Sequence, residues 1–345
     1  MRSFRCHRST AMFVAGLMAA SIGAAGQAPA AAEVTPQAPV MAQMNAEMLD
    51  TSPLMLGAAA ASKTQVLTHE AALGRRLNGL RIYYNWDSPL TNSYSTWARD
   101  TGHTLFVSIR SQRRNGTVVP YNDIIAAQPG DPLYADMLRQ AEEIKTFGEK
   151  IYIIYNHEPE ASQANPMGSP SEFAAAWRKL VSVYREAGVT NAEYVLTMTA
   201  WGFKRKDGRN VRYYYPGDDY VDHIAADGYN WYRCRKSTGK WTELSQIVEA
   251  QRAFGTEHPD KGLMLMEWSS TEDVDQPGRK AEWIANAADL FTQPGYEQYN
   301  TVLQWGGRNF SGNLACGFDY TTSESATQAF VDMASHPAYS AVSLP

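Results

Sequence analysis

The sequence predicts an α/β protein, a single (β/α)8 TIM barrel, and three observations support this fold. Short apolar runs alternate with segments of helical periodicity from about residue 52 to the C-terminus. Eight such units in about 290 residues match the size and rhythm of a (β/α)8 barrel. The alternative, a doubly wound open sheet, usually carries a glycine-rich phosphate loop after its first strand, and Gly57-Ala-Ala-Ala is not one.

Eight apolar runs are predicted to form the strands of the barrel. Dense β-branched and aromatic runs are typical of parallel strands that are covered on both faces. The first run is the weakest prediction, because alanine and glycine are uncommon in strands. The predicted strands are Pro53–Ala59, Leu80–Trp86, His103–Arg110, Ile151–Tyr155, Glu193–Trp201, His223–Tyr229, Gly262–Glu267 and Thr301–Trp305.

Segments between the later strands carry helix signals. Asp131-Pro132 begins a helix that Gly148 ends, and Ser169-Pro-Ser-Glu172 is a capping box for a helix that ends at Gly188. Apolar residues at helical spacing predict three more helices, which cover Leu244 to Gly255, Trp283 to Phe291 and Ala326 to Met333.

Composition is that of a globular protein and excludes some partners. The chain has 345 residues, of which 44% are hydrophobic and 19% are charged. Its net charge of −5 argues against a nucleic-acid partner, which would need a basic face. Nine Trp and nineteen Tyr are many for this length, but aromatic residues line cores and binding clefts alike. We expect a monomer.

Residues 1–32 are interpreted as a secretory signal peptide. Three arginines (Arg2, Arg5 and Arg8) precede an apolar run from Ala11 to Ala25, and small residues near Ala30 offer cleavage sites. The run is short for a membrane span, so we expect a secreted chain; an uncleaved anchor is the alternative. Residues 33–51 are predicted to be a flexible Ala/Pro/Met-rich lead, and residues 52–345 the (β/α)8 domain.

Two cysteines remain after removal of the signal peptide. Cys234 follows the sixth predicted strand and Cys316 follows the eighth, so both lie on loops at the same end of the barrel. A single disulfide between them is reasonable in an oxidising compartment, and two free thiols are the alternative. Cysteines without histidines at ligand spacing make a poor metal site. We therefore expect no metal and no cofactor.

Polar and aromatic residues gather at the predicted carboxyl ends of the strands, where barrel enzymes hold their active sites. This group comprises Asn156, His157 and Glu158 after the fourth strand, Trp201 on the fifth, Asp227 and Tyr229 on the sixth, Glu267 and Trp268 on the seventh, and Trp305 on the eighth. Glu267 ends a run of apolar residues, where a carboxylate is costly without a partner or a purpose. Paired carboxylates such as Glu158 and Glu267 suit glycosidic bond cleavage, and tryptophans can stack on sugar rings.

This arrangement resembles the retaining glycoside hydrolases of the (β/α)8 clan that carry glutamates on strands four and seven. The pair His157-Glu158 on the fourth strand resembles glycoside hydrolase family 26, the β-mannanase family, in which a histidine precedes the acid/base glutamate. The resemblance implies a secreted endo-β-glycosidase that hydrolyses β-1,4-mannan by double displacement. It assigns Glu158 as acid/base and Glu267 as nucleophile. It further assigns His157 as their partner at the site, Tyr229 as the nucleophile's hydrogen-bond donor, and Trp305 as the sugar platform.

The sequence leaves alternatives for the roles of several residues and for the substrate. Pro159 and Glu160 after the acid/base, and Trp268 after the nucleophile, depart from the family pattern and leave the substrate more open than the reaction. Glu160 competes with Glu158 for the acid role. His157 and Asp227 could instead serve only the structure, through hydrogen bonds beneath the site. Asn156, Trp201 and Trp268 are expected to contact substrate, but the two tryptophans could instead pack against loops. The polymer could be a β-glucan, a xylan or an exopolysaccharide, and a barrel that binds polysaccharide without cleaving it is a further alternative.

Overall fold

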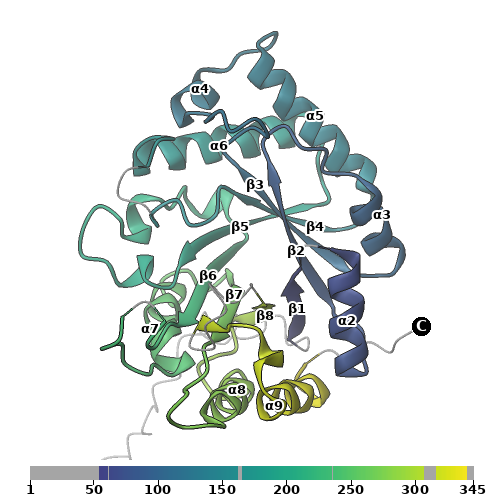
Figure 1. The fold of residues 1–345 in the computed structure, drawn as a ribbon. Helices are drawn as coiled ribbons and strands as arrows, with labels where there is room; N and C mark the ends of the chain where they lie inside the picture. The colour runs from purple at the N-terminus through teal and green to yellow at the C-terminus, as the bar shows by residue number, and fades with distance from the viewer. Residues whose placement is uncertain (1–53, 61, 162–164, 235, 307–315, 340–345) are drawn as a thin grey trace, which may run out of the picture.

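The computed structural model describes residues 54–60, 62–161, 165–234, 236–306 and 316–339. Eight parallel strands close into a barrel in sequence order, which confirms the predicted (β/α)8 fold (Figure 1). The strands are β1 (Met55–Ala59), β2 (Gly79–Asn85), β3 (Thr104–Arg110), β4 (Ile151–Tyr155), β5 (Ala192–Thr199), β6 (His223–Asn230), β7 (Gly262–Ser270) and β8 (Tyr299–Trp305). The predicted signal peptide and lead lie outside the described residues, so the boundary at residue 52 stays a prediction.

Helices surround the strands, as Figure 1 shows. They are α2 (Lys63–Leu73), α3 (Ser93–Asp100), α4 (Tyr121–Ala126), α5 (Pro132–Phe147), α6 (Pro170–Glu186), α7 (Leu244–Gly255), α8 (Arg279–Leu290) and α9 (Glu324–Ser335). The five predicted helices correspond to α5–α9. Sequence reasoning missed α2, α3 and α4, which are short or lack a clear apolar stripe. None of the helices in the described part of the chain has the length and apolarity of a membrane span.

Strand β1 is rich in alanine and glycine because the barrel leaves little room there. A Cβ atom built on Gly57 would lie 2.1 Å from the carbonyl oxygen of Gly79 and 2.5 Å from a methyl carbon of Leu303. Close approach of β1 to β2 and β8 therefore requires glycine at this position. The low strand propensity of this segment reflects packing inside the closed barrel.

Strand β7 contains a bulge that decides which side chains reach the active end of the barrel. Leu265 pairs with Ala226 and Glu267 pairs with Asp227, so Met266 is an extra residue on β7. Met264 and Met266 both point into the barrel core, and strict alternation would next place residue 268 inside. The bulge shifts this alternation by one residue. As a result Glu267 faces inward and Trp268 faces the helices.

Candidate active site

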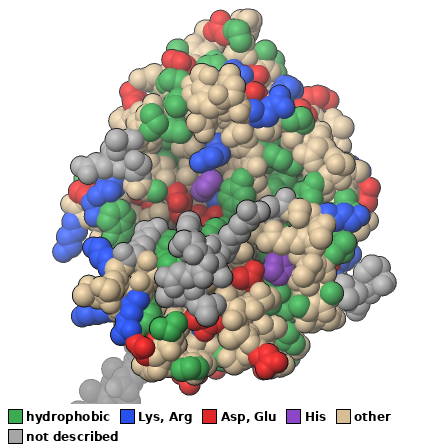
Figure 2. All heavy atoms as spheres, viewed as in Figure 1, with side chains coloured by type: hydrophobic (Ala, Val, Ile, Leu, Met, Phe, Trp, Pro, Cys, Tyr) green, Lys and Arg blue, Asp and Glu red, His purple; other side chains and the backbone are tan. Residues whose placement is uncertain are grey.

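A cavity of about 600 Å³ lies at the carboxyl end of the barrel. It is lined by Glu158, Ala161, Thr199, Ala200, Trp201, Lys204, Asp227, Tyr229, Trp231, Ile247, Glu267 and Trp305. Figure 2 shows acidic and histidine side chains in a hollow near the centre of this face. Six of the residues expected from the sequence therefore share one cavity, namely Glu158, Trp201, Asp227, Tyr229, Glu267 and Trp305.

The carboxylate of Glu267 is held by three donors. The hydroxyl of Tyr229 donates a hydrogen bond to Oε2, and the hydroxyl of Tyr83 donates one to Oε1. The guanidinium of Arg81 lies 3.1 Å from the same Oε1. Burial raises the pKa of both tyrosines, so each phenol keeps its proton and remains a donor. Donors on both oxygens orient the carboxylate within the cavity.

Sequence reasoning missed Arg81 and Tyr83, both on β2. Arg81 is completely buried; its Nη1 lies 2.9 Å from Oδ1 of Asp227, and its Nε donates to Ser108 Oγ at 3.0 Å. A charged residue inside the apolar run Leu80–Tyr84 was the available signal. Residues 81 and 83 share one face of the strand, so the arginine also predicts the direction of the tyrosine.

Arg81 provides positive charge between neighbouring carboxylates. One carboxyl oxygen from each of Glu158, Asp227 and Glu267 lies within 4.8 Å of the others. Burial disfavours the charged guanidinium, but attraction to Asp227, Tyr83 and Glu267 outweighs it and raises the pKa of Arg81. Burial also raises the pKa of Asp227, assisted by the charges of Glu267 and Glu158 and opposed by Arg81. The guanidinium contacts two of these three carboxylates, those of Asp227 and Glu267.

A distorted backbone turn after β4 carries Glu158 into the cavity. Asn156 has φ 42° and Glu158 has φ 49°, which is the left-handed region that most residues avoid. Each such residue costs on the order of 1–3 kcal/mol. The turn is fixed by backbone hydrogen bonds from Asn156 to the carbonyl of Ile109 and from Glu158 to the carbonyl of Thr197.

His157 lies at the site next to Tyr83, with its ring edge-on to the phenol at a centroid distance of 5.3 Å. Burial lowers the pKa of His157, and the nearby charges of Arg81 and Arg110 lower it further. The imidazole is therefore neutral at pH 7. Its Nδ1 is buried and makes no hydrogen bond to any residue that the structure describes.

Besides His157, two residues expected to contact substrate, Asn156 and Trp268, do not line the cavity. The side chain of Asn156 accepts from the backbone of Ser111 and donates to the hydroxyl of Tyr121, so it braces the turn from behind. Trp268 is 1% exposed and stacks on Trp283 because the β7 bulge turns it outward. We do not propose either as a sugar contact.

Glu160, the rival to Glu158, points away from the cavity and is fully buried. Its Oε1 accepts hydrogen bonds from the backbone of Thr199 at 2.7 Å and from the hydroxyl of the same residue at 2.6 Å. Burial raises the pKa of Glu160 to about 7. The side chain therefore ties the turn after β4 to the end of β5, and the geometry favours Glu158 as the acid.

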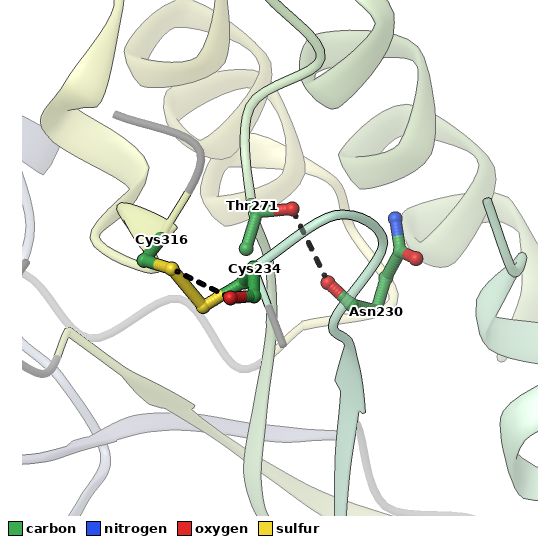
Figure 3. Close-up of a disulfide and its surroundings, with 4 residues drawn as sticks. All are labelled: Asn230, Cys234, Thr271 and Cys316. Atoms are coloured by element: carbon green, nitrogen blue, oxygen red, sulfur yellow. Dashed lines mark hydrogen bonds between the residues drawn. A yellow bond between two sulfur atoms is a disulfide. The ribbon is translucent and has the colours of Figure 1, made fainter. Parts of the chain in front are cut away.

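Tyr229, Trp231 and Trp305 line the cavity as part of an aromatic cluster, and a disulfide lies near this cluster on the loops after β6 and β8. The ring of Tyr229 contacts Trp231, Trp305 and Phe318 at centroid distances of 5.4, 5.6 and 5.3 Å. Cys234 and Cys316 form a disulfide, which confirms the predicted bond (Figure 3). Beside it, Thr271 donates a hydrogen bond to the carbonyl of Asn230, linking the ends of β7 and β6 (Figure 3).

Comparison with known sequences gives one distant curated relative. No protein-family model matches the chain. The chain is 24% identical over 257 residues to Endoglucanase H of Acetivibrio thermocellus. The match covers 70% of this chain and 26% of that protein. The chain thus spans about a quarter of the relative's length.

Solved structures of family 26 enzymes share the fold. A β-mannanase from Bacteroides ovatus superposes with a TM-score of 0.60 at 15% identity and covers 89% of this chain and 96% of its own. An endo-β-1,4-mannanase from Cellulomonas fimi gives 0.59 at 16% identity and covers 87% and 75%. The family 26 domain of a mannanase/glucanase from Prevotella bryantii gives 0.56 at 14% and covers 88% and 94%. The predicted resemblance to family 26 is confirmed at the level of the fold.

Proposed function

We propose that this protein is a retaining endo-β-glycosidase that hydrolyses β-1,4-mannan. The observation that carries the proposal is the pair Glu158 and Glu267, whose nearest carboxyl oxygens lie within 4.8 Å at the mouth of a closed barrel. Retaining glycosidases have carboxyl groups about 5–5.5 Å apart, whereas inverting enzymes need roughly 6.5–9.5 Å to admit water. The fold shared with family 26 mannanases supports the choice of substrate.

Each residue has a defined role in the proposed reaction. Glu267 attacks the anomeric carbon while Glu158 gives its proton to the leaving oxygen, which breaks the glycosidic bond and forms a glycosyl ester on Glu267. Glu158 then removes a proton from water, whose oxygen attacks the same carbon and releases Glu267. Tyr83, Tyr229 and Arg81 hold the nucleophile in line throughout. Two inversions give net retention.

A second candidate substrate is β-glucan, because the curated relative is named an endoglucanase and one structural relative is a mannanase/glucanase. Release of reducing ends from soluble mannan, cellulose derivatives, mixed-linkage glucan and xylan separates these candidates. Activity on glucan alone would replace mannan as the substrate. Anomer-resolved NMR of the first product tests retention, and an inverted product would contradict it.

The catalytic assignment is tested by substitution. Glu267→Ala should lower kcat by about 10⁴-fold or more while leaving the thermal unfolding curve intact. Glu158→Ala should regain turnover on an activated aryl glycoside when azide is added, with formation of a glycosyl azide. Activity near that of the wild type for Glu267→Ala would mean that the nucleophile is misassigned. A folded protein that binds oligosaccharide without turnover on any polymer would favour the non-catalytic barrel.

We further propose that the protein works outside the cytoplasm. The Cys234–Cys316 disulfide supports this location, because such bonds persist in oxidising compartments. The basic and apolar N-terminal sequence supports it independently. Detection of the protein in culture supernatant, with an N-terminus near residue 33, would agree with secretion, whereas retention in the membrane fraction would favour an anchor.

A further inference from the structure

Basic residues concentrate along one edge of the candidate cavity. The segment from Trp201 to Arg212 contains five Lys or Arg residues and one acidic residue, although the whole chain carries a net charge of −5. Figure 2 shows basic side chains at the left edge of this face, where the segment after β5 lies in Figure 1. The basic residues of the segment are Lys204, Arg205, Lys206, Arg209 and Arg212. A local surplus of one sign attracts ligands of the other.

Part of this surplus lies directly at the cavity. Lys204 and Trp201 both line it, and Trp201 is 45% exposed. The guanidinium carbons of Arg205 and Arg209 lie 3.7 and 4.7 Å from the centroid of the Trp201 ring. The cavity edge thus combines an aromatic ring with three cationic groups. An aromatic ring beside cations suits a sugar that carries negative charge.

Internal acidic partners neutralise only some of these cations. Arg205 and Arg209 share a single carboxylate, that of Asp207, and Arg212 pairs with Glu257. Lys206 forms no ion pair with any residue in the described ranges. Lys204 donates to the backbone carbonyl of Gln246 and has no carboxylate in contact among the described residues. Partial burial lowers the pKa of Lys204 and the charge of Glu249 opposes this shift, so an anion in the cavity would stabilise the ammonium group further.

A further cation, Arg110, lies at the end of the strand on the other side of β4. Arg110 ends β3, shares the inward face of that strand with Ser108, and is exposed. Ile109 pairs with Tyr155 and its carbonyl accepts a hydrogen bond from Asn156, so Arg110 follows directly beside the turn that carries His157, and its charge lowers the pKa of that imidazole. Among the described residues Arg110 has no carboxylate partner. Strands β3 and β5 are the two neighbours of β4, so cations follow the strands on both sides of the one that leads to Glu158.

We propose that the natural substrate is an acidic polysaccharide whose carboxylates bind at Arg110 and at Lys204 with Arg205 and Arg209. This inference rests on the proposed glycosidase function and adds that the cleaved β-linked backbone, whether mannan or another polymer, carries acidic sugars or acidic substituents. The carboxylate nucleophile Glu267 would repel a carboxylate on the sugar that reacts, so the charged sugars occupy the flanking positions. The carboxylate belongs either to a uronic acid ring or to an acidic substituent on a neutral ring.

The test compares each acidic polymer with its neutral form. Uronate-containing polymers are assayed beside the same polymers after carboxyl reduction, and pyruvylated exopolysaccharides beside their depyruvylated forms. We expect kcat/KM to be about tenfold or more higher on the acidic member of a pair, and this preference to shrink as salt rises from 20 to 300 mM. The pair that shows the effect identifies the source of the carboxylate. Equal rates on both members would overturn the proposal.

Substitutions connect the preference to the named cations. Arg110→Gln and Lys204→Gln should each reduce the acidic-to-neutral ratio of kcat/KM about three- to tenfold. Lys145→Gln, in the last turn of α5, removes an exposed cation at the other end of the barrel and should leave the ratio unchanged. A ratio unaltered by Arg110→Gln and Lys204→Gln would contradict the assignment.

A binding measurement separates this proposal from the glycosidase function. Glu267→Ala titrated with acidic oligosaccharides by calorimetry reports affinity without turnover. Binding that weakens with salt and with Lys204→Gln would support the acidic ligand even if the wild type cleaved no polymer, which would sink only the proposed reaction. Turnover of neutral mannan together with no acidic preference would sink only the inference about charge.

Discussion

At the scale of single residues, the site depends on how the oxygens of Glu267 are held. Tyr229 binds one oxygen, while Tyr83 and Arg81 bind the other. The sequence indicated Tyr229 because it follows an apolar run that ends in Asp227. Tyr83 gave no such signal, because tyrosine is common within strands and its partner lies 184 positions away in the chain. Long-range pairing of this kind is visible only after the barrel closes.

We predict that Tyr83→Phe lowers kcat/KM about 10- to 100-fold, because a hydrogen bond to a charged group is lost. Tyr229→Phe should have a similar effect. Tyr84→Phe is the matched control: its hydroxyl accepts from Asn92 on the outer side of β2, and its rates should stay within about threefold of wild type. Steady-state kinetics on the preferred polymer decides the matter. Wild-type rates for Tyr83→Phe would remove this residue from the catalytic apparatus.

Glu160 should make stability depend on pH. Burial raises its pKa from 4.5 to about 7, so between these values the folded protein retains a proton that the unfolded chain has lost. The contribution of the Glu160 carboxyl to the free energy of unfolding is fully present below pH 4.5 and is lost as the pH rises to about 7. The total loss is on the order of 3 kcal/mol.

Urea unfolding between pH 4 and 8 measures this effect in wild type and in Glu160→Gln. The difference in free energy of unfolding between the two proteins should change by roughly 3 kcal/mol over this range, in favour of the glutamine variant at high pH. Glu186→Gln, on the exposed end of α6, should leave the pH dependence as it is. If Glu160→Gln retained the wild-type slope, another group would be responsible.

At the scale of elements, strand positions were predictable and strand geometry was not. Apolar runs located all eight strands, and caps located α5 and α6. The bulge on β7 left no mark in the sequence, because Met266 is as apolar as its neighbours. Regular alternation continued from Met264 and Met266 would place Glu267 outside and Trp268 inside the barrel, so it assigns both residues to the wrong face. Glu267 was predictable because a carboxylate at the end of a buried apolar run needs a partner or a function. Trp268 was predicted to contact substrate, but the bulge directs it toward the helices.

Strand β1 provides a prediction about packing. Gly57→Ala should destabilise the fold by about 2 kcal/mol or more, because the added methyl group would meet the backbone of Gly79, which cannot move without shifting β2. Gly208→Ala is the control, since no atom lies within 4 Å of its added Cβ. Thermal and urea unfolding of both variants provide the comparison. Equal stabilities would show that β1 and β2 separate more easily than their packing indicates.

At the scale of the whole molecule, topology explains why the site was predictable in outline. All parallel strands of a barrel end on one face, so residues at eight separate strand ends must converge there. The same rule placed both cysteines at this face before their pairing was known. It could not predict Arg81, because a residue in the middle of a strand reaches the active end only through the length of its own side chain.

The disulfide connects two segments that are distant in the sequence and that both pack near Tyr229, the hydrogen-bond donor to Glu267. Cys234 and Cys316 are 82 residues apart in sequence, and the nearby aromatic residues Trp231 and Phe318 both pack on Tyr229. Replacing both cysteines by serine should lower the free energy of unfolding by about 4 kcal/mol, mainly through greater freedom of the unfolded chain. It should also lower kcat/KM, because the loops that position Tyr229 lose their connection. Thermal unfolding with and without reductant provides the measurement. The wild type in reductant should match the double serine variant. An oxidised wild type that is no more stable than this variant would show that the bond contributes nothing to the fold.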